Sequence, residues 1–224
     1  MIARAAHEIG LADLTMKSVA DRLGVSVPGL YHHVGGKDDL LRLTAEYSAS
    51  HLELPRDRGQ HWAVWLFEWA HYNRDAFRDQ PELLKQYLEG AIGFDRTSEI
   101  YEQVLVVLVR EGFTITDAVA AYTTVTAYAI GAAVNAIRQD RTLGDGLAAD
   151  DGFDRVLADH RPDELPHLRA AVAAGGIDPA TLFDPGLLSI LRGMAHDRDE
   201  PWPAVRARLR RAERARPNRT TSQE

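Results

Sequence analysis

Apolar residues recur at helical spacing along nearly the whole chain, and this spacing constrains the fold more than any other feature. Ile2, Ala5 and Ile9 fall on one face of a first helix, and Gly10 is a natural stop. A wide apolar stripe follows residues 115–139, and a stripe of that width needs more than one partner helix. The sequence has no segment with strand-like alternation. We therefore predict an all-α protein, with a small N-terminal helical unit on a larger helical domain.

Composition along the chain suggests three parts. The stretch ELPRDRG, residues 53–59, is typical of a linker in its proline, glycine and charge content. We divide the chain into an N-terminal unit of residues 1–47, a larger helical domain of residues 48–200 and a basic tail of residues 201–224. Because the tail is rich in arginine, we expect it to be a flexible, solvated terminus.

The residue types present exclude several classes of protein. The chain has no cysteine, which excludes disulfides, thiolate metal sites and cysteine nucleophiles. It has neither a long apolar run for a membrane span nor a signal peptide, so we expect a cytoplasmic location without membrane contact. It also has no glycine-rich phosphate loop and no nucleophile-elbow pattern. We therefore predict a protein that is not an enzyme and holds no cofactor.

The stretch TMKSVADRLGVSVPGLYHHVGGKDDL contains two short helical segments separated by a glycine turn. Thr15 is suited to cap the first segment, and Gly24 ends it. Pro28 fits the first turn of the second segment, and a longer helix is expected to begin near Lys37. Such a pair is the helix-turn-helix arrangement, which presents its second helix to the DNA major groove. The residues expected in its core are Ala20, Leu23, Val25 and Leu30.

The net charge and a competing function leave open whether this helix pair binds DNA. The net charge of −7 disfavours a nucleic-acid binder unless basic residues are concentrated locally. Short helical hairpins with a glycine turn also occur in proteins that never touch DNA. The competing hypothesis is a helical protein-interaction adaptor without DNA binding.

The segment LTMKSVADRLGVSVPGLYHHVGGKDDLL closely resembles the N-terminal signature of the tetracycline-repressor (TetR) family of transcriptional regulators. The matching pattern is Val-Ala, then Leu-Gly-Val-Ser, then Leu-Tyr-x-His, then Lys and Leu-Leu. Further along, VLVREGFTITDAVAAYTTVTAYAIGAAV and LFDPGLLSILRGM are similar to the long dimer helix and the final helix of the tetracycline repressors. The resemblance extends from residue 2 to about residue 196, more loosely after residue 47.

This resemblance implies a DNA-binding surface on the N-terminal unit. Val27 and Gly29 depart from the polar residues often found at their positions, so few direct hydrogen bonds to bases are expected. The given sequence begins inside the first helix, whereas family members usually carry a basic arm before it. If Met1 is the true start, we expect a shallow salt dependence of DNA binding; a start assigned too late in the sequence is the alternative, and the sequence leaves both open. The implied base or groove contacts are Lys17, Val27, Pro28, Gly29 and His32, and the implied phosphate contacts are Thr15, Tyr31, His33 and Lys37.

The resemblance further implies a homodimer that is released from a palindromic double-stranded DNA operator by a small-molecule inducer, most simply as a repressor. The 115–139 and 183–197 helices would pair across the two-fold axis, with close approach at Ala129, Ala132, Ala133 and Ala136. The residues expected to line the inducer site are Trp65, Trp69, Tyr72, Tyr87, Phe94, Tyr122, Thr126, Tyr128 and Asn135.

No metal site is predicted. The tetracycline repressors hold a drug-bound magnesium ion with a histidine, and the corresponding stretch here, YLEGAIGFDRT, has none. Tetracycline with magnesium is therefore not the expected ligand. His61, Glu68 and His71 lie near one another in the sequence, but this spacing is common by chance.

Overall fold

The computed structural model describes residues 1–51, 54–91, 93–144, 149–175 and 179–216. The described residues form α-helices, one short 3-10 helix and connecting segments, with no strand among them, which confirms the all-α prediction. None of these helices is both long enough and apolar enough to cross a bilayer. The helices are α1 (Ile2–Ile9), α2 (Met16–Leu23), α3 (Val27–Tyr31), α4 (Lys37–Ser50), α5 (Trp62–Asp79), α6 (Pro81–Leu88), α7 (Phe94–Arg110), α8 (Ile115–Gly144), α9 (Ala149–Ala158), α10 (Pro166–Ala173), α11 (Pro179–Asp197) and α12 (Trp202–Ala215), with the 3-10 helix η1 at Leu11–Asp13.

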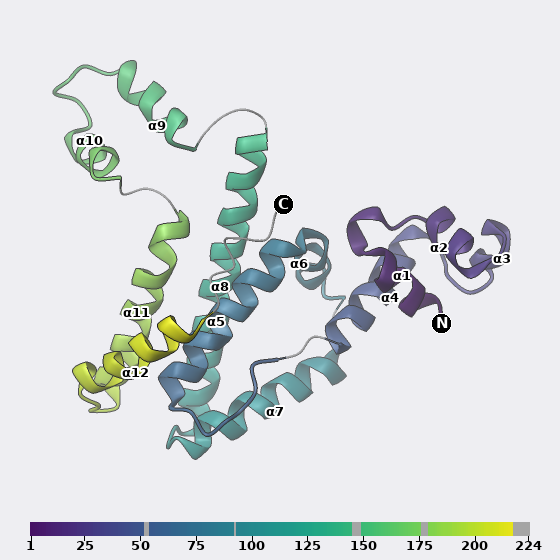
Figure 1. Cartoon of the computed structure of the whole chain (residues 1–224), viewed down its shortest axis with the longest axis horizontal. Helices are drawn as coiled ribbons and strands as arrows, with labels where there is room; N and C mark the ends of the chain where they lie inside the picture. Colours follow the sequence, from purple (N-terminus) through teal and green to yellow (C-terminus); the bar gives the residue numbers. More distant parts are fainter. Residues whose placement is uncertain (52–53, 92, 145–148, 176–178, 217–224) are drawn as a thin grey trace.

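The molecule is elongated, with a small helical head at one end (Figure 1). Helices α1 to α4 make up the head, and α5 to α8, α11 and α12 make up a larger body. Helices α9 and α10 extend beyond the body at the far end of α8. The head therefore lies apart from the longest helices and presents α2 and α3 at one tip of the molecule.

The core of the body is built around α5. Its side chains Trp62, Trp65, Leu66, Phe67 and Trp69 are all buried. They pack with buried residues of α7, α8, α11 and α12 in one hydrophobic cluster. Buried apolar residues lie on several sides of α5, and a helix of this kind requires packing neighbours on several sides.

A second cluster forms the core of the head. Ala20 of α2 and Leu30 of α3 are buried, as expected, together with Leu40 of α4. Leu23, also expected in this core, is half-buried and packs against it. Val25 was expected in this core, but it is 48% exposed. The reason is local, because Gly24 turns the chain at the end of α2 and the Val25 N–H donates to the Ala20 carbonyl (3.0 Å), which directs Val25 outward.

Helix α4 connects the head to the body. Leu40 belongs to the core of the head, whereas Ala45 packs in a third cluster with Phe77, Leu83 and Ala133 of the body. The division expected at residues 47 and 48 therefore falls inside one continuous helix. Head and body therefore share packed side chains through α4.

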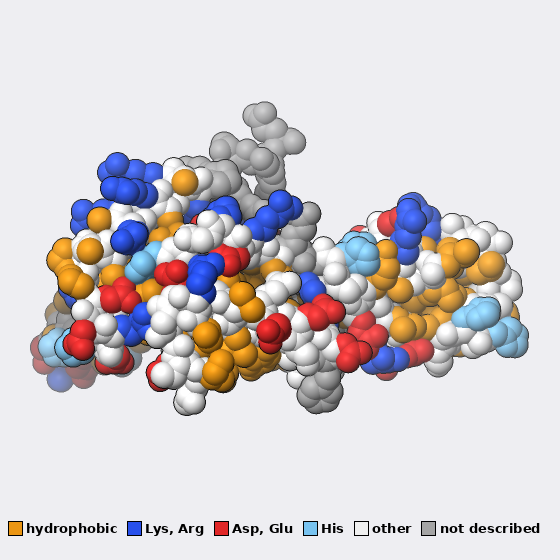
Figure 2. Space-filling view, turned by 90° about the horizontal axis from the view of Figure 1, so that it is seen from below, with side chains coloured by type: hydrophobic (Ala, Val, Ile, Leu, Met, Phe, Trp, Pro, Cys, Tyr) orange, Lys and Arg blue, Asp and Glu red, His pale blue; other side chains and the backbone are white. Residues whose placement is uncertain are grey.

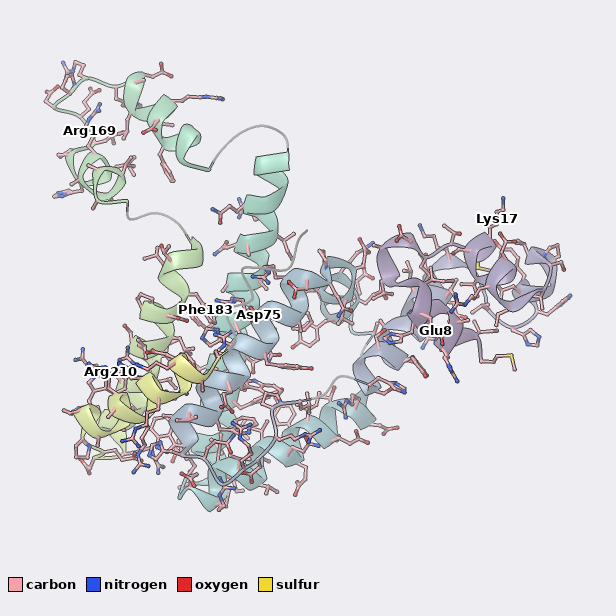
Figure 3. The ribbon with its side chains drawn as sticks, in the orientation of Figure 1. Glu8, Lys17, Asp75, Arg169, Phe183 and Arg210 are labelled. Atoms are coloured by element: carbon pink, nitrogen blue, oxygen red, sulfur yellow. The ribbon has the colours of Figure 1, made fainter. Side chains whose placement is uncertain are left out.

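The prediction of a flexible C-terminal tail is wrong for residues 202–215, which form α12. Val205 and Leu209 are buried in the core of the body, while Arg210 lies on the outer face (Figure 3). The segment is rich in arginine, but its apolar residues also recur at helical spacing. Burial of these residues against α5 offsets the conformational entropy lost when the helix forms. Residues 217–224 of the predicted tail lie outside the described residues.

We predict that Leu209→Ala destabilises the folded protein by about 2–5 kcal/mol, because it deletes a fully buried side chain between α12 and the rest of the body. Urea denaturation at a fixed protein concentration measures the change. Arg210→Ala, on the exposed face of the same helix, is the matched control. Equal unfolding midpoints for the two variants would show that α12 does not contribute to stability.

Candidate functional site

The N-terminal helix pair is fixed by local hydrogen bonds that the sequence encodes. The Thr15 hydroxyl accepts from the Ser18 N–H (2.9 Å), and the Ser18 hydroxyl accepts from the Thr15 N–H (2.9 Å), so α2 begins with a capping box. Gly24 ends α2 in the left-handed conformation at φ 68°. The Ser26 hydroxyl then accepts from the Gly29 N–H (3.1 Å) and caps α3, with Pro28 in its first turn. The capping role of Thr15 is confirmed, and that of Ser26 was missed.

The nine head residues implied as DNA contacts occupy one region around α2, α3 and the start of α4. Val27 and Gly29 are half-buried, and Val27 packs against the core of the head. Histidine side chains lie at the outer end of the head (Figure 2). The Lys17 side chain points away from the head (Figure 3). The other members of the set are exposed, namely Thr15, Lys17, Pro28, Tyr31, His32, His33 and Lys37.

Several acidic and basic side chains of the head pair with one another. Arg22 and Arg4 both bind the Glu8 carboxylate (2.6 and 3.1 Å), and these hydrogen bonds lower the pKa of Glu8. The Gly35 N–H and Arg42 lower the pKa of Asp39 in the same way. These arginines are therefore engaged within the protein. Lys17 and Lys37 make no ion pair among the described residues, so they are the cationic side chains of the head that are available to an anion.

A cavity of about 290 Å³ lies in the body, between α5, α7 and α8, and reaches α4 at Ala49. The Trp69 indole N–H donates to the Thr126 hydroxyl (2.9 Å), which ties α5 to α8 in the wall of this cavity. The described residues that line it are Ala49, Leu54, Trp69, Tyr72, Asn73, Phe77, Tyr87, Thr97, Ile100, Tyr101, Tyr122, Thr123, Thr126, Ala127 and Ile130.

Five of the residues expected at an inducer site line this cavity. They are Trp69, Tyr72, Tyr87, Tyr122 and Thr126.

Three others lie elsewhere. Trp65 stacks on Trp69 (5.4 Å between ring centroids) but lines a neighbouring cavity. The Tyr128 hydroxyl donates to the Phe183 carbonyl of α11 (2.9 Å). Asn135 is exposed on α8 and does not line the cavity. The side chain of Phe94 lies outside the described part of the chain.

Sequence reasoning missed the contribution of α7 and part of that of α5. Thr97, Ile100 and Tyr101 follow one another at helical spacing and together form the α7 wall. Asn73 and Phe77 continue the face of α5 that begins at Trp69. The helical period was visible in both segments, but nothing in the sequence showed which face of each helix would meet the cavity.

Burial controls the ionisation of two tyrosines in the cavity wall. It raises the pKa of Tyr72 to about 12, with Arg96 opposing the shift, and it raises the pKa of Tyr122 to about 12 as well. Both phenols therefore stay protonated at neutral pH and keep a hydrogen-bond donor. The Tyr72 hydroxyl is buried without a hydrogen-bond partner among the described residues.

The neighbouring cavity, of about 660 Å³, has a different chemical character. Trp65 lines it together with the charged residues Arg56, Asp57, Arg96 and Glu102. Leu54 borders both cavities. Several of the charged groups are already engaged in the protein, since Arg110 pairs with Asp57 and Arg96 binds the Ala49 carbonyl (3.0 Å).

His61, Glu68 and His71 have separate partners. His61 lies 3.0 Å from the Glu200 carboxylate, Glu68 binds Arg58 (2.6 Å), and His71 Nε2 lies 3.0 Å from Asp184 Oδ1. Within the described residues, no group of three or more histidine and acidic side chains is placed to hold a metal ion.

Comparison with known proteins identifies the fold of both parts. A model of the TetR family of bacterial regulatory proteins matches residues 2–43, and a model of the tetracyclin repressor-like C-terminal domain matches residues 54–198. The chain belongs to the TetR family. It is therefore a DNA-binding transcriptional regulator of the helix-turn-helix type. This result decides against the alternative of an adaptor without DNA binding.

Known relatives of this TetR-family regulator are similar over most of its length. It is 30% identical to the class A tetracycline repressor protein of Escherichia coli over 198 residues, which cover 86% of each chain. It is 29% identical to an HTH-type transcriptional regulator of Saccharopolyspora erythraea over 189 residues, covering 83% of this chain and 78% of the relative.

Solved structures give the same architecture. The Streptomyces coelicolor TetR family protein ActR, in complex with actinorhodin, has a TM-score of 0.65 at 21% identity, with 88% of this chain and 95% of ActR covered. TetR from Acinetobacter baumannii AYE has a TM-score of 0.55 at 25% identity, with 88% and 96% covered. The match to ActR concerns the fold alone. Helix α12 lies beyond the part of the chain that matches the C-terminal family model.

We predict that this TetR-family regulator loses stability as the pH rises from about 10 to about 12. The folded state holds Tyr72 and Tyr122 protonated up to a pKa of about 12, above the ordinary tyrosine value of 10.0, so their contribution is full below pH 10 and is lost as the pH passes the folded-state pKa. Urea midpoints across this range should fall less steeply for Tyr72→Phe than for the wild type. Tyr31→Phe, at an exposed position, is the control, and identical slopes for all three proteins would contradict the prediction.

Proposed function

We propose that this regulator is a repressor that binds a palindromic operator as a homodimer and leaves it when a small molecule occupies the cavity between α5, α7 and α8. One observation carries the proposal. Helix α4 contributes Leu40 to the core of the head and Ala49 to the wall of the cavity. These two positions lie nine residues apart, roughly 14 Å along one rigid helix. A ligand that displaces the end of α4 therefore changes how the head is held.

The thermodynamic requirement for release is that ligand and operator favour different arrangements of the heads. The third hydrophobic cluster provides the connection, because Ala45 of α4 packs on Leu83 of α6 and Ala133 of α8. Helix α8 also supplies Tyr122 and Thr126 to the cavity. Movement of α8 relative to α5 on ligand binding would be transmitted to α4 by these packed contacts.

The homodimer would use the outer faces of α8 and α11. Ala129 and Ala133 were expected at the two-fold axis, but both are fully buried within one protomer and so are unavailable to a partner. Ala132 and Ala136 are half-buried. Gly131 of α8 and Gly193 of α11 are exposed, and a Cβ added at either would meet open space. We propose that these two glycines mark the faces that approach the partner.

Tyr31 and Lys37 would contact operator phosphates, and Lys17 and His32 would reach the groove. Because few cationic side chains of the head are unpaired, the electrostatic part of the affinity is expected to be small. A regulator that acts on chromosomal DNA would work in the cytoplasm. The first experiment is a gel-shift series with the DNA that flanks its own gene, against an unrelated duplex, at several salt concentrations.

We predict that Lys37→Ala weakens binding to the operator and lowers the salt dependence. Each head would lose about one phosphate contact, so the magnitude of the slope of log K against log salt should fall by about 2 for a dimer. Arg210→Ala, exposed on α12 in the body and remote from the head, is the matched control and should leave the slope unchanged. If neither the wild type nor the variants distinguish the flanking DNA from the unrelated duplex, the proposal of an operator there is wrong.

A further inference from the structure

The cavity between α5, α7 and α8 has a lining without charge. None of its described lining residues is an acid, a base or a histidine. The adjacent larger cavity, in contrast, is lined by Arg56, Asp57, Arg96 and Glu102. A charged group transferred into the uncharged cavity would lose its hydration without gaining an ion-pair partner, which is strongly unfavourable. The lining therefore selects against ionised ligands.

Aromatic rings dominate the wall and come from four helices. Tyr101 of α7 meets Tyr122 of α8 edge to face (4.8 Å between centroids), and Trp69 of α5 lies 5.6 Å from the same Tyr122. Phe77 of α5 and Tyr87 of α6 form another pair at 5.2 Å. A planar aromatic guest extends such a set of tilted rings through stacked and edge-to-face contacts. A volume of about 290 Å³ restricts the guest to a compact molecule.

Two polar groups in the wall have hydrogen-bonding capacity left. The buried Tyr72 hydroxyl has no partner among the described residues. The Asn73 side-chain N–H donates to the Trp69 carbonyl (2.9 Å), which leaves the side-chain oxygen of Asn73 as an acceptor. A buried donor without a partner is destabilising, so a ligand carbonyl that accepts from Tyr72 recovers that energy.

We propose that the ligand of this cavity is a neutral, compact, planar aromatic molecule with a carbonyl-type acceptor for Tyr72, bound without a metal ion. The inference rests on the proposed function, because it names the inducer class for the same site. It also explains why a metal chelate is a poor fit. Magnesium in proteins is usually held by one or two carboxylates, and the described lining provides neither a carboxylate nor a histidine.

The test uses two probes with the same ring system, coumarin-3-carboxamide and coumarin-3-carboxylate. Both are compact and planar with a ring carbonyl, and at neutral pH they differ in charge. Isothermal titration of the full chain in a buffer containing EDTA should show the amide binding at least tenfold more tightly than the carboxylate. Equal or tighter binding of the carboxylate, a requirement for magnesium, or no detectable binding of the amide at millimolar concentration would overturn the proposal.

Two variants tie the binding to the cavity. Tyr72→Phe should weaken the amide about fivefold to tenfold by removing the hydroxyl donor, whereas Tyr47→Phe on α4, outside the lining of both cavities, should leave it unchanged. Thr123→Glu places a carboxylate in the wall and should weaken the amide even if Tyr72→Phe fails to fold. Unchanged binding in Thr123→Glu would overturn the assignment to this cavity.

A separate readout distinguishes this proposal from the proposed function. The amide is added to the complex of the regulator with the DNA segment found in the gel-shift series. Binding to the protein without release of the DNA would leave the ligand class in place and contradict the inducer mechanism. Release by the carboxylate or by a magnesium chelate, but not by the amide, would support the mechanism and overturn the ligand class.

Discussion

The packing of α5 against its neighbours is the constraint on which the rest of the body depends. Its tryptophans and Phe67 form the centre of the main core, and α7, α8, α11 and α12 are all arranged around them. Two other faces of α5 contact different parts of the structure. Trp69, Tyr72 and Asn73 face the cavity, while His71 and Asp75 face α11 and the end of α12.

Polar contacts hold the second side of α5 against α11 and the end of α12. His71 lies 3.0 Å from Asp184 of α11, and Arg216 beyond α12 binds Asp75 (3.1 Å). Arg74 lies over the Phe183 ring, 4.3 Å from its centroid. Burial lowers the pKa of His71 while Asp184 opposes that shift, and the contact with His71 lowers the pKa of Asp184. These contacts fix the position of α11 relative to the helix that lines the cavity.

Helix α4 connects the head to the body through packed side chains. The head could have been joined to the body by a flexible linker, and the charged stretch at residues 53–59 suggested one. Instead, Ala45 and Ala49 of α4 pack against the body before that stretch begins. This packed connection supports our proposal that a change at the cavity alters the position of α3 at the far tip of the molecule.

The sequence by itself determined the helical class, the helix pair of the head and its caps, because these depend on short-range spacing and on side chains that bond their own backbone. Thr15, Gly24 and Pro28 could be assigned in this way. Only the tertiary structure decided which faces meet. It placed Tyr101 and Asn73 in the cavity and Asn135 outside it, buried Ala129 and Ala133 within the protomer, and packed Leu209 of the arginine-rich tail into the core. Those outcomes depend on contacts between residues far apart in the chain, and the period of a single helix carries no information about its neighbours.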